Sequence, residues 1–144
     1  MKVGAITLMT LFLMALPLAA FAGGDPCASG TDSDGDTIVD VCDNCSALAT
    51  AIVCDTDGDG YGNPCDGDFD QNLASNAIDF GTYFIPDFLP PGTDSGRGTD
   101  MDCNLAVNAI DFGTWFIPGF LPPGTPGPSG LSCASAATQS CPTP

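Results

Sequence analysis

Large hydrophobic side chains are concentrated in three short runs, and polar, turn-forming residues fill most of the remaining chain. The first run occupies residues 3–18. The other two, residues 77–85 and 109–117, each follow a polar loop and are followed by a proline. Their apolar positions do not alternate strictly with polar ones, so a two-turn helix that ends at the proline is favoured over a strand. This pattern predicts a small, mostly irregular fold with short α-helices.

The first hydrophobic run has the organisation of an export signal. It follows the positive start Met1-Lys2, and residues 20–22 (Ala-Phe-Ala) supply a small-x-small cleavage pattern. The run is too short to span a bilayer comfortably, and no later segment is long and apolar enough to do so. We therefore expect residues 1–22 to be a signal peptide, and the mature chain to start at Gly23 and be secreted.

The two later runs belong to an internal duplication. Residues 68–93 and 100–125 differ at five positions over 26 residues, at an offset of 32. Units of this size cannot each bury a core alone, so the two copies are expected to pair face to face. The shared core is predicted to contain Leu73, Ile78, Phe80, Phe84, Leu105, Ile110, Phe112 and Phe116.

Changes in composition divide the chain into four segments. The predicted signal peptide, residues 1–22, precedes an Asp- and Cys-rich segment, residues 23–66. The duplicated module occupies residues 67–125, and a tail rich in Pro, Gly, Ser and Cys occupies residues 126–144. The tail is expected to be irregular.

The charge of the chain is strongly negative and comes from one residue type. There are 18 acidic residues against two basic ones, and every acidic residue is Asp. Such a balance argues against nucleic-acid binding, which needs basic patches. The exclusive use of the short carboxylate suggests a positional requirement, as in turns and tight oxygen cages. Without a cation, the mature chain is expected to repel itself and fold poorly.

The aspartates follow one twelve-residue ion-binding pattern that occurs four times. Calcium prefers six to eight oxygen ligands, and such a loop supplies them from positions 1, 3, 5, 7, 9 and 12, with a backbone carbonyl at position 7. Fifteen of the 18 aspartates fall at these positions. The predicted ligands are Asp32, Asp34, Asp36, Ile38, Asp40 and Asp43 in loop 1; Asp55, Asp57, Asp59, Tyr61, Asn63 and Asp66 in loop 2; Asp68, Asp70, Asn72, Ala74, Asn76 and Asp79 in loop 3; and Asp100, Asp102, Asn104, Ala106, Asn108 and Asp111 in loop 4.

Two features distinguish these loops from the usual calcium loop. Position 12 is Asp rather than the longer Glu, and position 6, which usually needs glycine for a sharp turn, is glycine only at Gly60. Thr37, Leu73 and Leu105 occupy it elsewhere, so either these residues adopt a costly positive φ or the turn differs in shape. Up to four Ca²⁺ ions are expected; Mg²⁺ is the lesser candidate because it demands a tight octahedral geometry.

The eight cysteines are expected to form disulfides. An even number in a small exported chain favours disulfides over thiols, and the absence of histidine disfavours zinc. Eight cysteines allow 105 pairings, so the sequence assigns no connectivity. The short spacing of Cys133 and Cys141 suggests only that these two close the tail on itself.

Two segments resemble known families. The segments TDSDGDTIVDVCDNC and CDTDGDGYGNPCD, which begin at Thr31 and Cys54, give residues 32–66 a resemblance to thrombospondin type 3 repeats. In those repeats Asp-rich loops wrap calcium and cysteines join neighbouring turns. Residues 68–125 resemble a type I dockerin, whose two calcium loops have the form D-x-D/N-x-D/N-x-x-x-N-x-x-D, each followed by a helix. The resemblance implies a duplicated, EF-hand-like loop-helix pair and a cohesin-like partner that contacts Ala77, Ile78, Ala109 and Ile110.

A secreted, calcium-binding, non-catalytic protein is the function that these features favour. The chain has no His or Glu, and the aspartates that could act as acid or base are explained as ligands. Calcium-dependent protein–protein binding or extracellular assembly is the first expectation. The alternatives are a calcium-rigidified structural spacer, adhesin or filament subunit, and an accessory module of extracellular polysaccharide degradation.

Overall fold

The computed structural model describes residues 27–122, 124–134 and 141, so the predicted signal peptide lies outside the described residues. No strand occurs in the described part of the chain. The predicted small, irregular, disulfide-stabilised fold with short helices is therefore confirmed. Its elements are the 3-10 helices η1 (Asp40–Cys42) and η2 (Asn63–Cys65), the π-helical segments η3 (Asp79–Phe84) and η4 (Asp111–Phe116), and the α-helices α1 (Ile85–Phe88) and α2 (Ile117–Phe120).

Each copy of the duplication forms one continuous helical segment, residues 77–88 and 109–120. The prediction that these helices end at the proline is wrong. The Ile85 N–H donates to the Phe80 carbonyl oxygen, five residues back, and this wider turn accommodates the ring of Pro86. The helix ends instead at Leu89, whose extended backbone (φ −66°, ψ 149°) is the conformation favoured before a proline.

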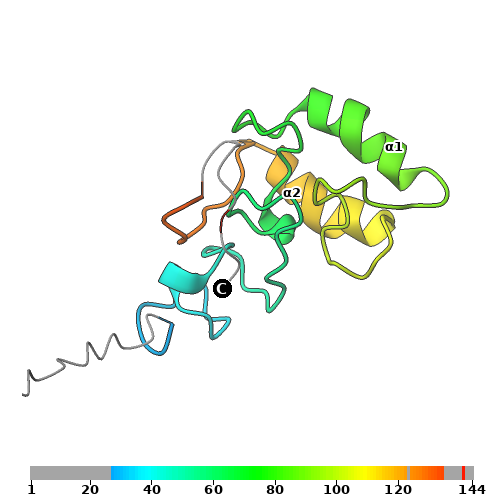
Figure 1. Ribbon diagram of the computed structural model, residues 1–144. Coiled ribbons are helices and arrows are strands. Elements are labelled where there is room, and N and C mark those ends of the chain that lie inside the picture. The colour runs from blue at the N-terminus through cyan, green and yellow to red at the C-terminus, as the bar shows by residue number, and fades with distance from the viewer. Residues whose placement is uncertain (1–26, 123, 135–140, 142–144) are drawn as a thin grey trace, which may run out of the picture.

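The two helical segments lie side by side and run antiparallel (Figure 1). Each carries phenylalanine at every fourth position, which places three rings on one helical face. The rings pair in opposite order: their centroids are 6.5 Å apart for Phe80–Phe120, 5.0 Å for Phe84–Phe116 and 6.5 Å for Phe88–Phe112. The predicted face-to-face pairing of the copies is therefore an aromatic seam.

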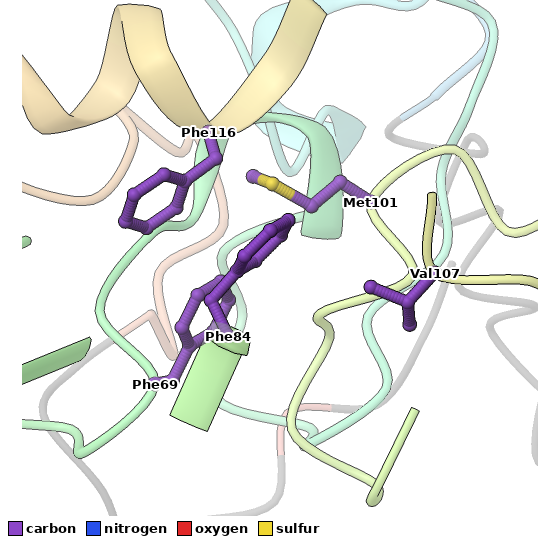
Figure 2. Packing of buried hydrophobic residues seen from close by; sticks show 5 residues of the cluster. All are labelled: Phe69, Phe84, Met101, Val107 and Phe116. Carbon is purple, nitrogen blue, oxygen red and sulfur yellow. The ribbon is translucent and has the colours of Figure 1, made fainter. Parts of the chain in front are cut away.

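The buried core extends from this seam to the loops that precede the helices. Figure 2 shows Phe84 and Phe116 close to Phe69 and Met101, with Val107 at the edge of the group. Phe69 and Met101, both at position 2 of a loop, are fully buried. A phenylalanine or methionine between two aspartates thus anchors loops 3 and 4 to the core.

Half of the predicted core is wrong. Phe84 and Phe116 are buried, and Phe80 and Phe112 pack against them. The aliphatic residues are exposed instead: Leu73 by 44%, Ile78 by 53%, Leu105 by 92% and Ile110 by 52%. The seam is filled by rings at a four-residue spacing, so these four aliphatic side chains face away from it.

Reciprocal backbone hydrogen bonds reinforce the pairing of the two copies. The Ser75 N–H donates to the Gly124 carbonyl oxygen at 2.8 Å, and the equivalent Val107 N–H donates to the Gly92 carbonyl oxygen at 3.0 Å. Each copy thus binds the turn that follows the helix of the other copy. This exchange links the two copies into one module.

All eight cysteines are paired, as predicted. The bonds are Cys27–Cys42, Cys45–Cys65, Cys54–Cys103 and Cys133–Cys141, the last of which confirms the suggested closure of the tail. The Cys54–Cys103 bond joins the Asp- and Cys-rich segment to the duplicated module. Four disulfides indicate an oxidising compartment. Among the described residues, no helix is long and apolar enough to cross a membrane.

Candidate metal centre

Four groups of three carboxylates converge, one group in each predicted loop. Within each group, one oxygen from every side chain lies within 4.8 Å of the others. Calcium ligands 2.3–2.6 Å from a common ion fall within such a separation. The groups are Asp32, Asp34 and Asp36; Asp55, Asp57 and Asp59; Asp68, Asp70 and Asp79; and Asp100, Asp102 and Asp111. Each group could hold a metal ion.

The four loops share a left-handed backbone at the same two positions. Position 4 has positive φ in every loop, at Gly35 (84°), Gly58 (76°), Gln71 (63°) and Cys103 (56°). Position 6 does too, at Thr37 (83°), Gly60 (95°), Leu73 (65°) and Leu105 (74°). Of the two alternatives for position 6, the structure has the left-handed backbone, although for a residue with a Cβ that conformation costs roughly 1–2 kcal/mol.

A repeated hydrogen bond holds this turn. In each loop the position-1 carboxylate accepts the N–H of position 6: Thr37 to Asp32 at 3.1 Å, Gly60 to Asp55 at 2.9 Å, Leu105 to Asp100 at 2.7 Å, and Leu73 to Asp68. The first aspartate therefore organises the backbone around it and also offers its oxygens to the cluster. This bond offsets part of the cost of the left-handed residues.

In loops 3 and 4 the helix start brings position 12 into the carboxylate group. The Asn76 side-chain oxygen accepts the Ile78 N–H at 2.8 Å, and the Asp79 carboxylate accepts the Asn76 N–H at 2.8 Å. This reciprocal pair is a capping box at the start of helical residues 77–88. Asn108 and Asp111 repeat it. Capping turns the position-12 carboxylate back towards the loop, where its other oxygen accepts the position-3 N–H at 3.2 Å in both copies.

In loops 1 and 2 the carboxylate group contains position 5, and positions 9 and 12 lie outside it. A 3-10 turn rather than a long helix follows, so Asp40 accepts the Ser33 N–H at 2.8 Å and Asn63 accepts the Thr56 N–H at 2.8 Å. Asp43 and Asp66 are buried and accept the N–H groups of Cys45 and Asp68, each at 2.8 Å. Three of the five predicted carboxylates therefore converge in loop 1 and three of the four in loop 2, whereas all three converge in loops 3 and 4.

The remaining predicted ligands are backbone carbonyls and amides. The carbonyl oxygens of Ala74 and Ala106 accept the side-chain N–H groups of Asn76 and Asn108, at 2.7 and 2.8 Å. Asn72 and Asn104 are exposed and donate their backbone N–H to the position-1 carboxylates. At the other position-7 residues, Ile38 and Tyr61, the backbone N–H donates to the position-5 carboxylate at 2.8 Å.

The carboxylates of loop 2 and its neighbours are electrostatically strained. Burial, together with the charges of neighbouring aspartates, raises the pKa of Asp57 to about 7 and that of Asp59 to about 6. Burial raises the pKa of Asp66 well above its usual value, and Asp59 adds to the effect. Burial also raises the pKa of four further carboxyls, Asp43, Asp68, Asp79 and Asp111. A bound cation would remove this repulsion.

Two oxygens of the carboxylate groups are buried without a hydrogen-bond partner, Asp34 Oδ2 and Asp70 Oδ1. A buried acceptor left unpaired costs about 1–3 kcal/mol. Both belong to position 3 of their loops. A cation bound by the carboxylate group would give both oxygens a partner.

The four residues predicted to contact a partner are all exposed. Ala77 and Ile78 occupy the first helical turn of one copy, and Ala109 and Ile110 occupy that of the other. The structure therefore leaves the equivalent surface of each copy open.

Several residues that contact the loops were not predicted from the sequence. Gln71 donates to the Asp57 carboxylate at 2.6 Å and so links loop 3 to loop 2. Arg97 donates to the Phe69 carbonyl oxygen at 2.8 Å, and its guanidinium lies 4.4 Å from the centroid of the Tyr83 ring. Arg97 is the only basic residue in the described part of a chain with 18 acidic residues, and this rarity is the sequence signal for its structural role. Its hydrogen bond supports the backbone of loop 3.

No protein-family model matches the chain, and comparisons with curated proteins and with solved structures find no significant similarity. The evidence for function therefore rests on the geometry of the four loops.

Proposed function

We propose that this chain is a secreted, non-catalytic calcium-binding protein in which bound Ca²⁺ organises the fold. The observation that carries the proposal is the repetition of one loop geometry four times, each with three converging carboxylates. A solvated acidic surface has no need for the same left-handed residues and the same carboxylate-to-amide bond in every copy. The unpartnered oxygens Asp34 Oδ2 and Asp70 Oδ1 support the same conclusion.

Calcium is the ion that this ligand set favours. The sequence offers carboxylate, amide and carbonyl oxygens, and it contains no histidine. Calcium accepts six to eight oxygens in a flexible arrangement, which tolerates a loop with three carboxylates supplemented by carbonyls and water. Magnesium demands near-ideal octahedral geometry and gives up its waters reluctantly. An irregular chain with few regular elements suits the more flexible ion.

Two of the five differences between the copies of the duplicated module coincide with different neighbours. Gln71 donates to loop 2, whereas its counterpart Cys103 forms the disulfide with Cys54. Asp87 binds Ser95 and Thr99, whereas the equivalent residue, Gly119, carries no side chain. The five differing pairs are Phe69/Met101, Gln71/Cys103, Ser75/Val107, Tyr83/Trp115 and Asp87/Gly119.

The exposed residues of the two copies are identical where the fold makes no demand for identity. Leu73 and Leu105 match, and so do the pairs Ala77-Ile78 and Ala109-Ile110, all of them exposed. Two equivalent apolar patches on one module suit a partner that can bind either copy. We therefore propose calcium-dependent protein binding, to a cohesin-like domain or to a second copy of the chain, as the role of this dockerin-like module.

Calcium titration of the oxidised mature chain, residues 23–144, tests the central proposal. Calorimetry is expected to show saturable uptake of about two to four ions, and far-UV circular dichroism to show a gain of ordered signal that a chelator reverses. A magnesium titration at the same concentrations is the control for ion selectivity. The absence of uptake at millimolar calcium would mean that the aspartates form only a solvated surface.

Paired substitutions test the binding role. Ile78→Asp and Ile110→Asp each place a charge on one exposed patch and leave the aromatic seam untouched. Sedimentation with and without calcium, alone and with a panel of cohesin-like domains, should detect complexes for the wild type and for each single variant. The double variant should form none. Equal binding by the double variant would exclude these patches.

A further inference from the structure

Loop 2 differs from the other loops at position 6, where it alone has a glycine. All four position-6 residues have positive φ, yet Thr37, Leu73 and Leu105 adopt it with a side chain. The left-handed backbone therefore does not by itself require glycine at this position. A second constraint must act on Gly60.

That constraint is the close approach of the C-terminal tail. A Cβ on Gly60 would lie 2.7 Å from the Ala134 Cα and 2.7 Å from the Cys141 Sγ. At Gly58, two positions earlier and also at positive φ, a Cβ would meet nothing within 4 Å. Gly60 is thus needed for packing rather than for conformation.

The tail segment that covers loop 2 is called here the C-terminal strap, and it comprises residues 126–134 and Cys141. It leaves α2 and returns to the N-terminal half of the molecule, where it is coloured orange to red in Figure 1. The Cys133–Cys141 disulfide closes it. The Gly127 N–H donates to the Cys65 carbonyl oxygen at 3.0 Å, and the Gly130 N–H donates to the Asp43 carbonyl oxygen at 2.9 Å. The strap is therefore attached near the ends of loops 1 and 2.

Two further hydrogen bonds hold the central turn of loop 2. The Cys141 N–H donates to the Gly58 carbonyl oxygen at 2.7 Å, and the Ser129 hydroxyl donates to the Gly60 carbonyl oxygen at 2.6 Å. These carbonyls belong to positions 4 and 6, whose N–H groups donate to the Asp55 carboxylate at 2.7 and 2.9 Å. The strap and the first ligand therefore fix the same two residues from opposite sides.

We propose that the C-terminal strap preorganises loop 2 for its metal ion, with Ser129 and the Cys133–Cys141 disulfide as positioning residues. This inference rests on the proposed metal binding. A turn already held in its binding conformation loses less freedom when the ion arrives, so affinity rises without any added ligand. In loops 1, 3 and 4 the residue at position 6 is exposed, so no comparable segment covers those loops at this position.

Terbium luminescence offers a readout specific to loop 2, because Tyr61 lies at position 7 of that loop and can sensitise a bound Tb³⁺. The Tyr61→Phe variant identifies the signal that comes from this site. Removal of the strap bond by Cys133→Ser with Cys141→Ser should weaken Tyr61-sensitised Tb³⁺ binding about tenfold. Ser129→Ala, which leaves every disulfide intact, should weaken it about threefold. Calcium calorimetry should show unchanged binding at the remaining loops.

A matched pair of glycine variants isolates the packing contact. Gly60→Ala and Gly58→Ala both place a Cβ at positive φ, but only the first meets the strap. In the wild-type background Gly60→Ala should weaken Tb³⁺ binding more than Gly58→Ala does. When the Cys133–Cys141 disulfide is also removed by the two serine substitutions, the two glycine variants should weaken Tb³⁺ binding equally.

Hydrogen exchange of the ion-free chain gives a readout that needs no metal. The amides of residues 58–61 should exchange faster in the variant without the Cys133–Cys141 disulfide. The exchange rates of amides in loops 3 and 4 should stay unchanged. The strap inference alone is wrong if the wild type binds ions and three variants bind Tb³⁺ as tightly as their controls do. These are the variant without the Cys133–Cys141 disulfide, Ser129→Ala and Gly60→Ala. If the wild type takes up neither Tb³⁺ nor Ca²⁺, the proposed function fails and the inference falls with it.

Discussion

Asp59→Asn is expected to stabilise the ion-free protein while it weakens metal binding. Asp59 is only 6% exposed, and its Oδ1 accepts the Tyr61 N–H at 2.8 Å. Burial, with the charges of Asp55 and Asp68, raises its pKa from 3.8 to about 6. An asparagine oxygen can keep the bond to Tyr61, and the substitution removes the charge. A pKa raised to this extent corresponds to about 3 kcal/mol of destabilisation at neutral pH.

The pH dependence follows from the direction of the shift. The folded state holds the Asp59 proton more tightly than the unfolded state, so ionisation costs stability as pH rises from 3.8 to about 6, and the full cost is present above that. The ion-free wild type should therefore become more stable as pH falls from 7 to about 4. The Asp59→Asn variant should lose part of this dependence.

Urea unfolding of the oxidised chain in chelator, at pH 7 and pH 5, measures the effect. We expect the variant to gain about 2–3 kcal/mol at pH 7, and less at pH 5. With millimolar calcium the order should reverse, because the variant lacks a ligand of loop 2. Asp36→Asn, at the same position of loop 1, is the control; Asp36 is only half-buried and water screens its charge, so its gain should be smaller. A destabilised Asp59→Asn protein in chelator at pH 7 would refute the reasoning.

Three further predictions concern the core, the cysteines and the strained turn. Phe84→Ala, at the centre of the aromatic seam, should cost about 3–5 kcal/mol in urea unfolding, and the partly exposed Phe88→Ala clearly less; equal costs would contradict the seam. Alkylation of the exported, oxidised protein followed by mass measurement should label no thiol, and two or more labelled thiols would contradict the four disulfides. Leu105→Asn should raise the melting temperature of the ion-free protein by a few degrees, because asparagine tolerates φ near 74° better and Leu105 is already 92% exposed; a lower melting temperature would count against a strained turn.

Residues close together in the sequence were the ones that could be predicted. The register of the aspartates defined the four loops because a twelve-residue ion-binding turn is local, and three of its carboxylates converge in every copy. The duplication predicted that the copies pair, and the phenylalanine spacing accounts for the seam between Phe84 and Phe116. The even cysteine count predicted full pairing, since it depends on chemistry and compartment rather than on shape.

Contacts between distant residues were decided by the tertiary structure alone. Position 12 joins the carboxylate group at Asp79 but not at Asp66, because only a following helix turns that side chain back through its capping bond. The exposure of Leu105 depends on which face the aromatic seam covers, and the need for Gly60 depends on a strap that lies about seventy residues further along the chain. The spacing of candidate ligands within a loop can be read from the sequence because it is local. The burial of a side chain, the partner of a cysteine and the segment that covers a loop depend on contacts that form only when the chain folds back on itself.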